Sequence, residues 1–133
     1  MQNLWPEITV EDRIETPRNI LQEQAKYLSQ QTKNTIIGQV GVGRTGEEFL
    51  CEFSIISPPL GYSTRLFSVR YRLIDIYPAE FAVDADLAKD LTGKSEPARI
   101  PARDRDEFVA LLSRIFSADS TTRILKALKQ HLQ

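Results

Sequence analysis

The longest strand-like stretch of the chain, Tyr62 to Pro78, constrains the fold more than any other segment. Aromatic and β-branched residues recur along it, and no glycine or proline interrupts it before Pro78. A strand of this length can pair with a neighbour along its whole length and can support helices on one or both faces. We therefore expect the other elements to be arranged around it.

The alternation of side chains gives this strand two faces of different character. One face is apolar and aromatic, with Phe67, Val69, Tyr71 and Leu73. The other face is apolar at both ends and basic in the middle, with Leu66, Ser68, Arg70, Arg72, Ile74 and Ile76. One helix layer can cover only one face, so we expect the apolar positions of the second face to meet another layer or another chain.

A helix and a hairpin are predicted before the long strand. Thr16-Pro17 supplies an N-cap hydroxyl and a proline at the first helical position, and an apolar stripe then continues to about Lys33-Asn34. Residues 35–42 and 47–57 are each predicted to form a strand. The breaker cluster 58–61 returns the chain to the long strand.

The signals after Pro78 predict shorter elements. Residues 80–83 continue as a strand past a bend, and Asp84 caps a short helix. Residues 92–102 hold one glycine and two prolines and are expected to form a loop. Asp104 and Glu107 form a capping-box pattern that begins a helix, and a break at 117–119 opens the last helix.

The predicted fold class is therefore α+β. An antiparallel meander of three to four strands is packed by the N-terminal helix and by two C-terminal helices. No linker divides the chain, so residues 1–133 are expected to form a single domain. Within it, residues 1–15 form an N-terminal arm in which Trp5 packs on its own domain and Ile8 to Val10 form a short edge strand.

The composition is that of an ordinary globular protein, with 41% hydrophobic and 26% charged residues. The formal net charge of −1 provides no overall field that would draw the chain to nucleic acid or to an anionic membrane. Cys51 is the only cysteine, which excludes an intrachain disulfide and fits a reducing compartment. Neither a secretory signal nor a membrane-spanning apolar run is recognised, so we expect a cytoplasmic protein.

The segment from Gly41 to Gly46 matches the G-x-G-x-x-G pattern of phosphate-binding loops. In a dinucleotide site the third glycine lies in a helix whose N-terminus holds the pyrophosphate, whereas Glu47-Glu48-Phe49 opens an alternating strand. The lysine, HRD and DFG elements of a protein kinase are also absent. We therefore predict that Gly41–Gly46 is a hairpin connection and that the chain does not bind nucleotides.

The residues that usually carry metal or nucleophilic chemistry are scarce. His131 is the single histidine, and Cys51 has no basic neighbour in sequence and is interpreted as a small core residue. The acidic run of Asp84, Asp86 and Asp90 lacks the glycine and closing glutamate of a calcium loop. We expect no catalytic residue, no metal and no other cofactor.

Arg70 and Arg72, on the mixed face of the long strand, are the most informative polar residues. A nucleic-acid surface would add exposed aromatic residues on the same face, but those of this strand fall on the opposite face. Instead of binding a partner, the two arginines could form cross-strand ion pairs with Glu48 or Glu52 on the neighbouring strand.

The order of a helix, a meander, Tyr77-Pro78 and further helices is similar to the layout of ubiquitin-conjugating enzymes and RWD domains. The HPN motif of those enzymes and a cysteine after the meander are both absent from this sequence. The resemblance therefore implies a noncatalytic binding module.

We expect a noncatalytic protein–protein interaction module, such as an adaptor, a chaperone or an immunity-type protein, that binds through one face of the sheet. The expected surface has a basic centre and an apolar frame, and suits an acidic protein partner or a second copy of the chain: Arg70, Arg72, Leu66, Ile74, Ile76 and Leu50. Two alternatives stay open. One is a small enzyme or ligand-binding protein with a cleft of carboxylates and arginines, and the other is a nucleic-acid binder.

Overall fold

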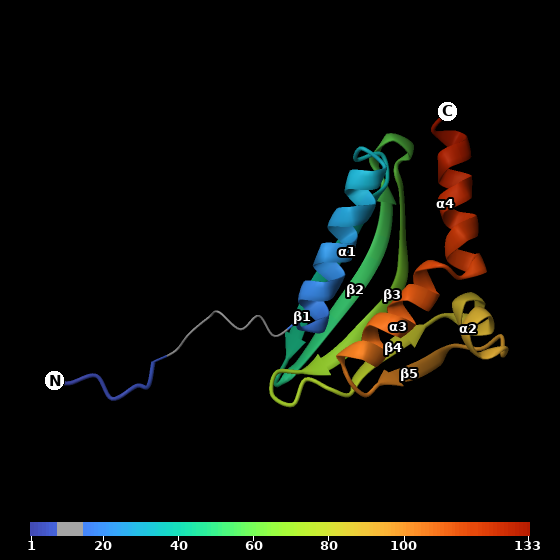
Figure 1. The fold of residues 1–133 in the computed structure, drawn as a ribbon. Coiled ribbons are helices and arrows are strands. Elements are labelled where there is room, and N and C mark those ends of the chain that lie inside the picture. Colours follow the sequence, from blue (N-terminus) through green and yellow to red (C-terminus); the bar gives the residue numbers. More distant parts are fainter. Residues whose placement is uncertain (8–14) are drawn as a thin grey trace.

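The computed structural model describes residues 1–7 and 15–133, and its α+β architecture confirms the predicted fold class (Figure 1). Its antiparallel strands form one sheet in the order β1-β2-β3-β4-β5. The strands are β1 (Ile37–Thr45), β2 (Glu48–Ser57), β3 (Tyr62–Arg72), β4 (Ala79–Val83) and β5 (Ala98–Ala102). The helices are α1 (Pro17–Gln31), the 3-10 turn η1 (Pro58–Leu60), α2 (Ala85–Thr92), α3 (Arg105–Phe116) and α4 (Asp119–His131).

Two predictions about the sheet are wrong. Residues 98–102, expected to be a loop, form the fifth strand, because an edge strand tolerates Pro101, which lacks a backbone N–H. The long strand ends at Arg72 instead of Pro78, and Asp75 takes a positive φ of 55° in the connection that follows. The chain thus turns sooner than the apolar pattern suggested.

The hairpin between β1 and β2 is tighter than predicted. Gly46 has a φ of 60° and occupies the first of two central positions between the paired residues Thr45 and Glu48. Gly41 and Gly43 belong to β1 itself. Because a strand follows the third glycine, the G-x-G-x-x-G segment offers no helix N-terminus to a phosphate.

The predicted helix starts are confirmed. The Thr16 side chain accepts a hydrogen bond from the Asn19 N–H at 3.2 Å, and Asp84 accepts one from the Leu87 N–H at 3.0 Å. Asp104 accepts one from the Glu107 N–H at 2.8 Å. Each cap satisfies a backbone donor that the first turn of a helix leaves unpaired.

A bulge in β3 changes which side chains face the helices. Phe67 lies opposite Phe53, but the next pair is Arg65 with Ser54, so Leu66 is an additional residue in β3. Leu66 and Phe67 are consequently both buried on the helix-bearing side of the sheet. The prediction that Leu66 lies on the second face is wrong, because strict alternation does not hold across a bulge.

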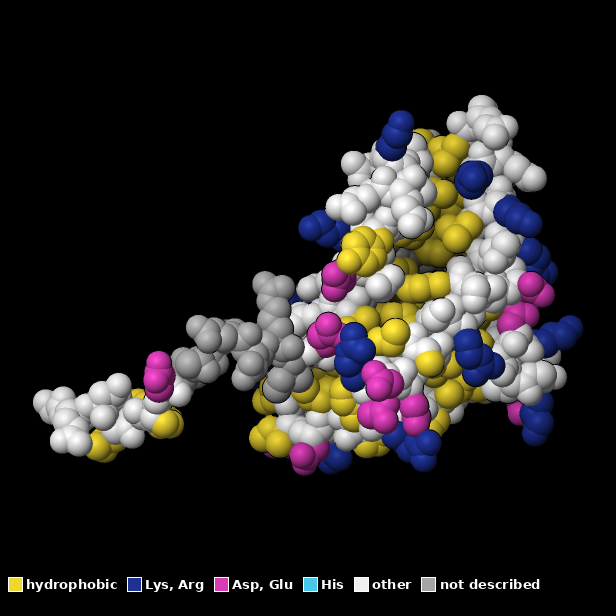
Figure 2. Space-filling view, in the orientation of Figure 1, with side chains coloured by type: hydrophobic (Ala, Val, Ile, Leu, Met, Phe, Trp, Pro, Cys, Tyr) yellow, Lys and Arg dark blue, Asp and Glu magenta, His cyan; other side chains and the backbone are white. Residues whose placement is uncertain are grey.

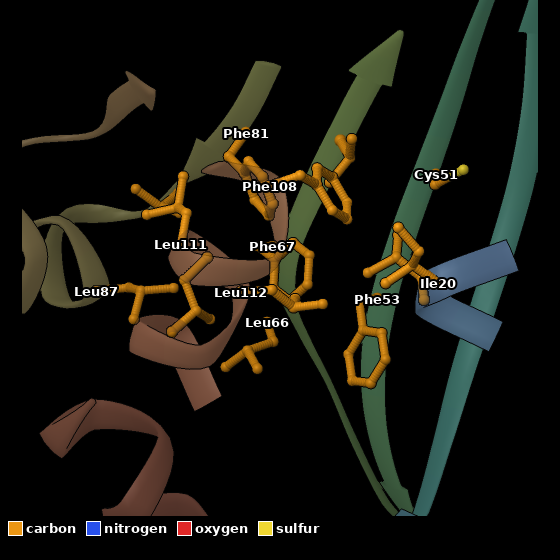
Figure 3. Packing of buried hydrophobic residues seen from close by; sticks show 14 of the residues in the cluster. Ile20, Cys51, Phe53, Leu66, Phe67, Phe81, Leu87, Phe108, Leu111 and Leu112 are labelled. Carbon is orange, nitrogen blue, oxygen red and sulfur yellow. The ribbon is translucent and has the colours of Figure 1, made fainter. Parts of the chain in front are cut away.

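A row of phenylalanine rings joins the sheet to α3 (Figure 3). Phe53 and Phe67 stack with their centroids 5.3 Å apart and their planes only 3° apart. Phe67 contacts Phe81 at 5.6 Å, and Phe81 contacts Phe108 of α3 at 4.8 Å. Rings at these separations add favourable contacts to the burial of their apolar area, so this row anchors the core.

The opposite side of the sheet, which we call the outer face, carries no helix in the described part of the chain. In β2 its residues are Leu50, Glu52, Ser54 and Ile56, all half-buried, while Cys51, Phe53, Ile55 and Ser57 are buried on the helix side. An antiparallel sheet can leave one face in water when that face alternates with a buried one. The described residues therefore form two layers.

The N-terminal arm differs from its prediction. Residues 1–7 extend away from the domain in Figure 1, and Leu4 and Trp5 are 77% and 76% exposed. The expectation that Trp5 packs on its own domain is therefore wrong. The predicted strand at 8–10 lies outside the described residues. Glu15 forms an ion pair with Arg105 at the start of α3, which ties the chain to the domain just before α1.

Gly38 provides a test of how closely α1 packs on β1. A Cβ at Gly38 would lie 2.7 Å from Ala25 Cα, whereas a Cβ at Gly41 or Gly43 would meet no atom within 4 Å. We expect Gly38→Ala to lower the free energy of unfolding by about 1–3 kcal/mol, because the backbone of α1 must shift. Gly41→Ala and Gly43→Ala are matched controls without such a loss. Equal effects at all three positions in chemical denaturation would contradict this packing.

Candidate functional site

Three of the six residues predicted to bind a partner lie elsewhere than expected. Leu66 is buried by the bulge, and Ile76 packs against the core. Ile74 is 68% exposed in the connection after β3, where no strand holds it on the outer face. The outer face retains Leu50, Arg70 and Arg72, and Leu50 lies directly opposite Arg70. The apolar frame expected around the two arginines therefore does not form.

Cross-strand ion pairs occupy the outer face instead. Arg70 Nε lies 3.9 Å from the Glu48 carboxylate, and Arg65 Nη1 lies 3.6 Å from the Glu52 carboxylate. A third pair of the same kind joins β5 to β4. The structure thus shows the pairing of Arg70 with Glu48 that the sequence suggested, and such exposed pairs contribute little stability each.

A double-mutant cycle tests this structural role of Arg70. We expect a coupling energy between Arg70→Gln and Glu48→Gln of about 0.2–1 kcal/mol at low ionic strength, because both side chains are about half exposed. The coupling should shrink as salt is added. A coupling above about 2 kcal/mol in urea denaturation would contradict a weak solvated pair.

On the helix side, the C-terminal helix α4 is held at its beginning by a side chain of α2. The N-cap residue of α4 is Ala118, which makes no side-chain cap. The Asp90 side chain of α2 takes the place of this missing cap. Its Oδ2 accepts hydrogen bonds from the Ser120 N–H at 2.8 Å and from the Ser120 hydroxyl at 2.6 Å. The Thr121 hydroxyl donates to the Ile115 carbonyl at 2.7 Å, so the start of α4 is fixed to both α2 and α3.

The two hydrogen bonds from Ser120 lower the pKa of Asp90. A carboxyl whose folded pKa is depressed stabilises the fold above its unfolded pKa of about 3.9 and loses that contribution as the pH falls through the folded pKa. We expect Asp90→Asn to lower the thermal unfolding midpoint at neutral pH and this difference to shrink below about pH 4. A difference that is the same at both pH values would contradict the role of the charge.

Beyond its first turn, α4 stands beside the first half of β3, and a groove of about 610 Å³ separates them. We call it the β3–α4 groove. Its apolar lining comes from η1, β3, α2 and α4: Leu60, Tyr62, Leu66, Leu87, Ile124 and Leu128. Leu60 and Tyr62 are still 38% and 39% exposed, so the groove presents apolar surface to water.

A second groove of about 290 Å³ runs along the other flank of α4, toward α1. Figure 2 shows hydrophobic side chains along the hollow between these two helices. Its lining includes Phe53 and Leu66 from the sheet, Leu28 from α1 and Leu125 from α4. The neighbouring residues Ile124 and Leu125 therefore point into different grooves, and we call the second one the α1–α4 groove.

Three polar side chains of the β3–α4 groove have structural partners. Asp84 caps α2, and Arg65 pairs with Glu52. His131 Nδ1 lies 2.8 Å from the carbonyl oxygen of Ala127 on its own helix. Within residues 1–7 and 15–133, no three His, Cys, Asp or Glu side chains form a group that could hold a metal ion.

Cys51 is fully buried in β2, and burial raises the pKa of its thiol. A thiol that stays protonated is a poor nucleophile, and this one is sealed from solvent. The prediction that Cys51 is a core residue is confirmed.

Comparisons of the chain with protein-family models, with curated proteins and with solved structures found no match. No helix of the described residues is long and apolar enough to cross a membrane.

Sequence reasoning missed the β3–α4 groove. One signal was present, since Leu66 and Phe67 are adjacent apolar residues that break the alternation of the strand. A second was the adjacent pair Ile124 and Leu125, which widens the apolar stripe of the last helix beyond what one contact surface needs. Neither signal shows which segment lies opposite.

Proposed function

We propose that the protein is a noncatalytic protein-interaction module that receives an apolar segment of a partner in the β3–α4 groove. The observation that carries the proposal is a concave, largely apolar lining in which Leu60 and Tyr62 are exposed and Ile124 is half-buried. Binding sites are typically concave and apolar with few polar groups. The free thiol of Cys51 supports a reducing compartment, and we place the module in the cytoplasm.

The length of the groove favours a peptide over a compact molecule. Its lining along α4 extends from Ser120 to His131, which at 1.5 Å per residue corresponds to roughly 16 Å. A short segment of polypeptide spans such a distance, with side chains that alternate between the groove and solvent. Cleft chemistry is the weaker alternative, because two of the four Asp and Arg side chains that line the groove, Asp84 and Arg65, serve structural contacts.

The outer face supports this function less well than the groove. Leu50 and Ile56 are separated there by Glu52 and Ser54, and charged pairs lie around them. Large continuous apolar patches mark interaction sites, whereas scattered apolar residues do not. The same break in the patch weakens the argument for self-association through the sheet.

The proposal can be tested with matched variants on α4. Random peptides of about a dozen residues, displayed on phage, are selected on the full chain and then measured against Ile124→Gln and Leu125→Gln. Both side chains are partly buried neighbours, so the two substitutions should cost similar stability. We expect Ile124→Gln to weaken the selected peptides about tenfold or more and Leu125→Gln to leave their affinity nearly unchanged.

Two results would contradict the proposal. One is a selection that retains no peptide. The other is a set of peptides that ignore Ile124→Gln but lose affinity with Leu125→Gln, which would assign binding to the α1–α4 groove, or with Arg70→Gln, which would assign it to the outer face.

A further inference from the structure

Among the described residues, the first half of β3 has a neighbouring strand on only one side. β3 pairs with β2 along Tyr62–Arg72, but its pairing with β4 covers only Ser68–Arg70. β4 ends at Val83, where Asp84 turns the chain into α2. The edge of residues 62–67 therefore has no partner strand in the described chain, and such an edge offers backbone donors and acceptors to another strand.

The bulge at Leu66 explains why this edge is free. An additional residue in one strand increases the local twist and disrupts the ladder. β4 pairs with β3 only on the far side of the bulge, up to Ser68. The open edge of residues 62–67 is thus a consequence of the strand register at the bulge.

The β3–α4 groove lies where the missing strand would run. On the inner side of the unpaired segment, Tyr62, Thr64 and Leu66 line the groove, and Ile124 and Leu128 of α4 form the facing wall. A strand added in line with β4 would place every second side chain between these two walls. Its backbone would pair with β3, and α4 would cover its inner face.

The other two free edges of the sheet lack this combination. Three of the nine positions of β1, Gly38, Gly41 and Gly43, supply no side chain to pack against an added strand. β5 contains Pro101, which cannot donate a ladder hydrogen bond. The β3 edge joins an unpaired backbone to an apolar groove within the described residues.

The charged residues that line the groove indicate what net charge a partner segment should have. Two acidic residues, Asp84 and Asp86, and two basic residues, Arg65 and Arg123, line it, so their formal charges cancel. A lining without net charge does not favour an acidic segment or a nucleic-acid backbone. It suits a neutral segment with apolar side chains at alternate positions.

We propose that the β3–α4 groove binds an extended, neutral segment of a partner protein that adds to β3 as a further strand. This inference rests on the proposed function, because it concerns the same groove. Strand addition is an established mode of peptide recognition, in which backbone hydrogen bonds give affinity and pockets for alternate side chains give specificity. The slot opposite residues 62–67 accommodates about six residues at roughly 3.4 Å each.

Synthetic peptides test the strand directly. The probe is an acetylated and amidated heptapeptide with alternating threonine and valine. Two analogues carry N-methyl groups on either the valine or the inner threonine nitrogens, which removes the donors of one edge or the other. The readout is amide chemical shift and hydrogen exchange across the ¹⁵N-labelled full chain, with Ile124→Gln as the groove variant.

We expect the unmodified probe, at millimolar concentration, to shift amides within 62–67 and to slow the exchange of those that face the open edge. At least one N-methylated analogue should bind about tenfold more weakly, because it loses two or more ladder hydrogen bonds. Equal binding of all three peptides, shifts confined to β1, or no shifts at all would overturn strand addition.

These results separate the inference from the function on which it rests. If phage-selected peptides depend on Ile124 but N-methylation has no effect, the groove binds partners without forming a ladder, and only the strand inference fails. If the probe pairs with residues 62–67 equally well in Ile124→Gln, strand addition stands and the apolar groove is not its determinant.

Discussion

The stacked pair of Phe53 and Phe67 determines how β3 lies against β2, and much of the structure depends on that register. The two rings are parallel within 3° and continue through Phe81 to α3. In β3, residues 67–72 pair with 48–53 and residues 62–65 pair with 54–57, so one residue of β3 between these two blocks has no partner in β2. Leu66 is that residue, and burying it on the helix side retains apolar contact that an outward position would lose. The bulge is therefore a consequence of packing two apolar neighbours at once.

The same register explains why the two halves of β3 have different surroundings. Beyond the bulge, Val69 and Tyr71 are buried and β4 completes the ladder. Before it, Tyr62 and Thr64 face α4 across a groove, and no strand follows on that side among the described residues. A helix cannot satisfy the edge of a sheet, because its own backbone groups are bonded within the helix. Apolar cover by α4 and an open ladder thus occur together for a geometric reason.

Local signals explain most of what the sequence predicted correctly. Thr16, Asp84 and Asp104 begin helices through side-chain caps, which depend on residues only three positions away. The failures concern features that depend on distant partners. Pro101 argued against a strand because proline has no backbone N–H to donate. β5 tolerates it because β5 is an edge strand that, within the described chain, pairs only with β4, so one side of its backbone needs no ladder hydrogen bond. Leu66 was assigned to the outer face from the alternation of side chains. Alternation alone does not reveal an additional residue in a strand unless the partner strand is known. The candidate site shares this limit, since the 46 residues 73–118 separate β3 from α4 in the sequence.

The attachment of α4 connects the groove to the stability of the whole helix side. Asp90 holds the first turn, and Leu128 is buried near the other end, but Ile124, Leu125 and Leu132 are only partly buried. A helix of this length gains most of its stability from packing and little from its own hydrogen bonds. Any segment that fills the β3–α4 groove would bury more of Ile124 and would therefore stabilise α4 in its observed position. Binding and the order of α4 are then linked, because a ligand that recognises only the folded groove shifts the equilibrium toward it. The outer face, whose charged pairs are complete without a partner, has no comparable linkage.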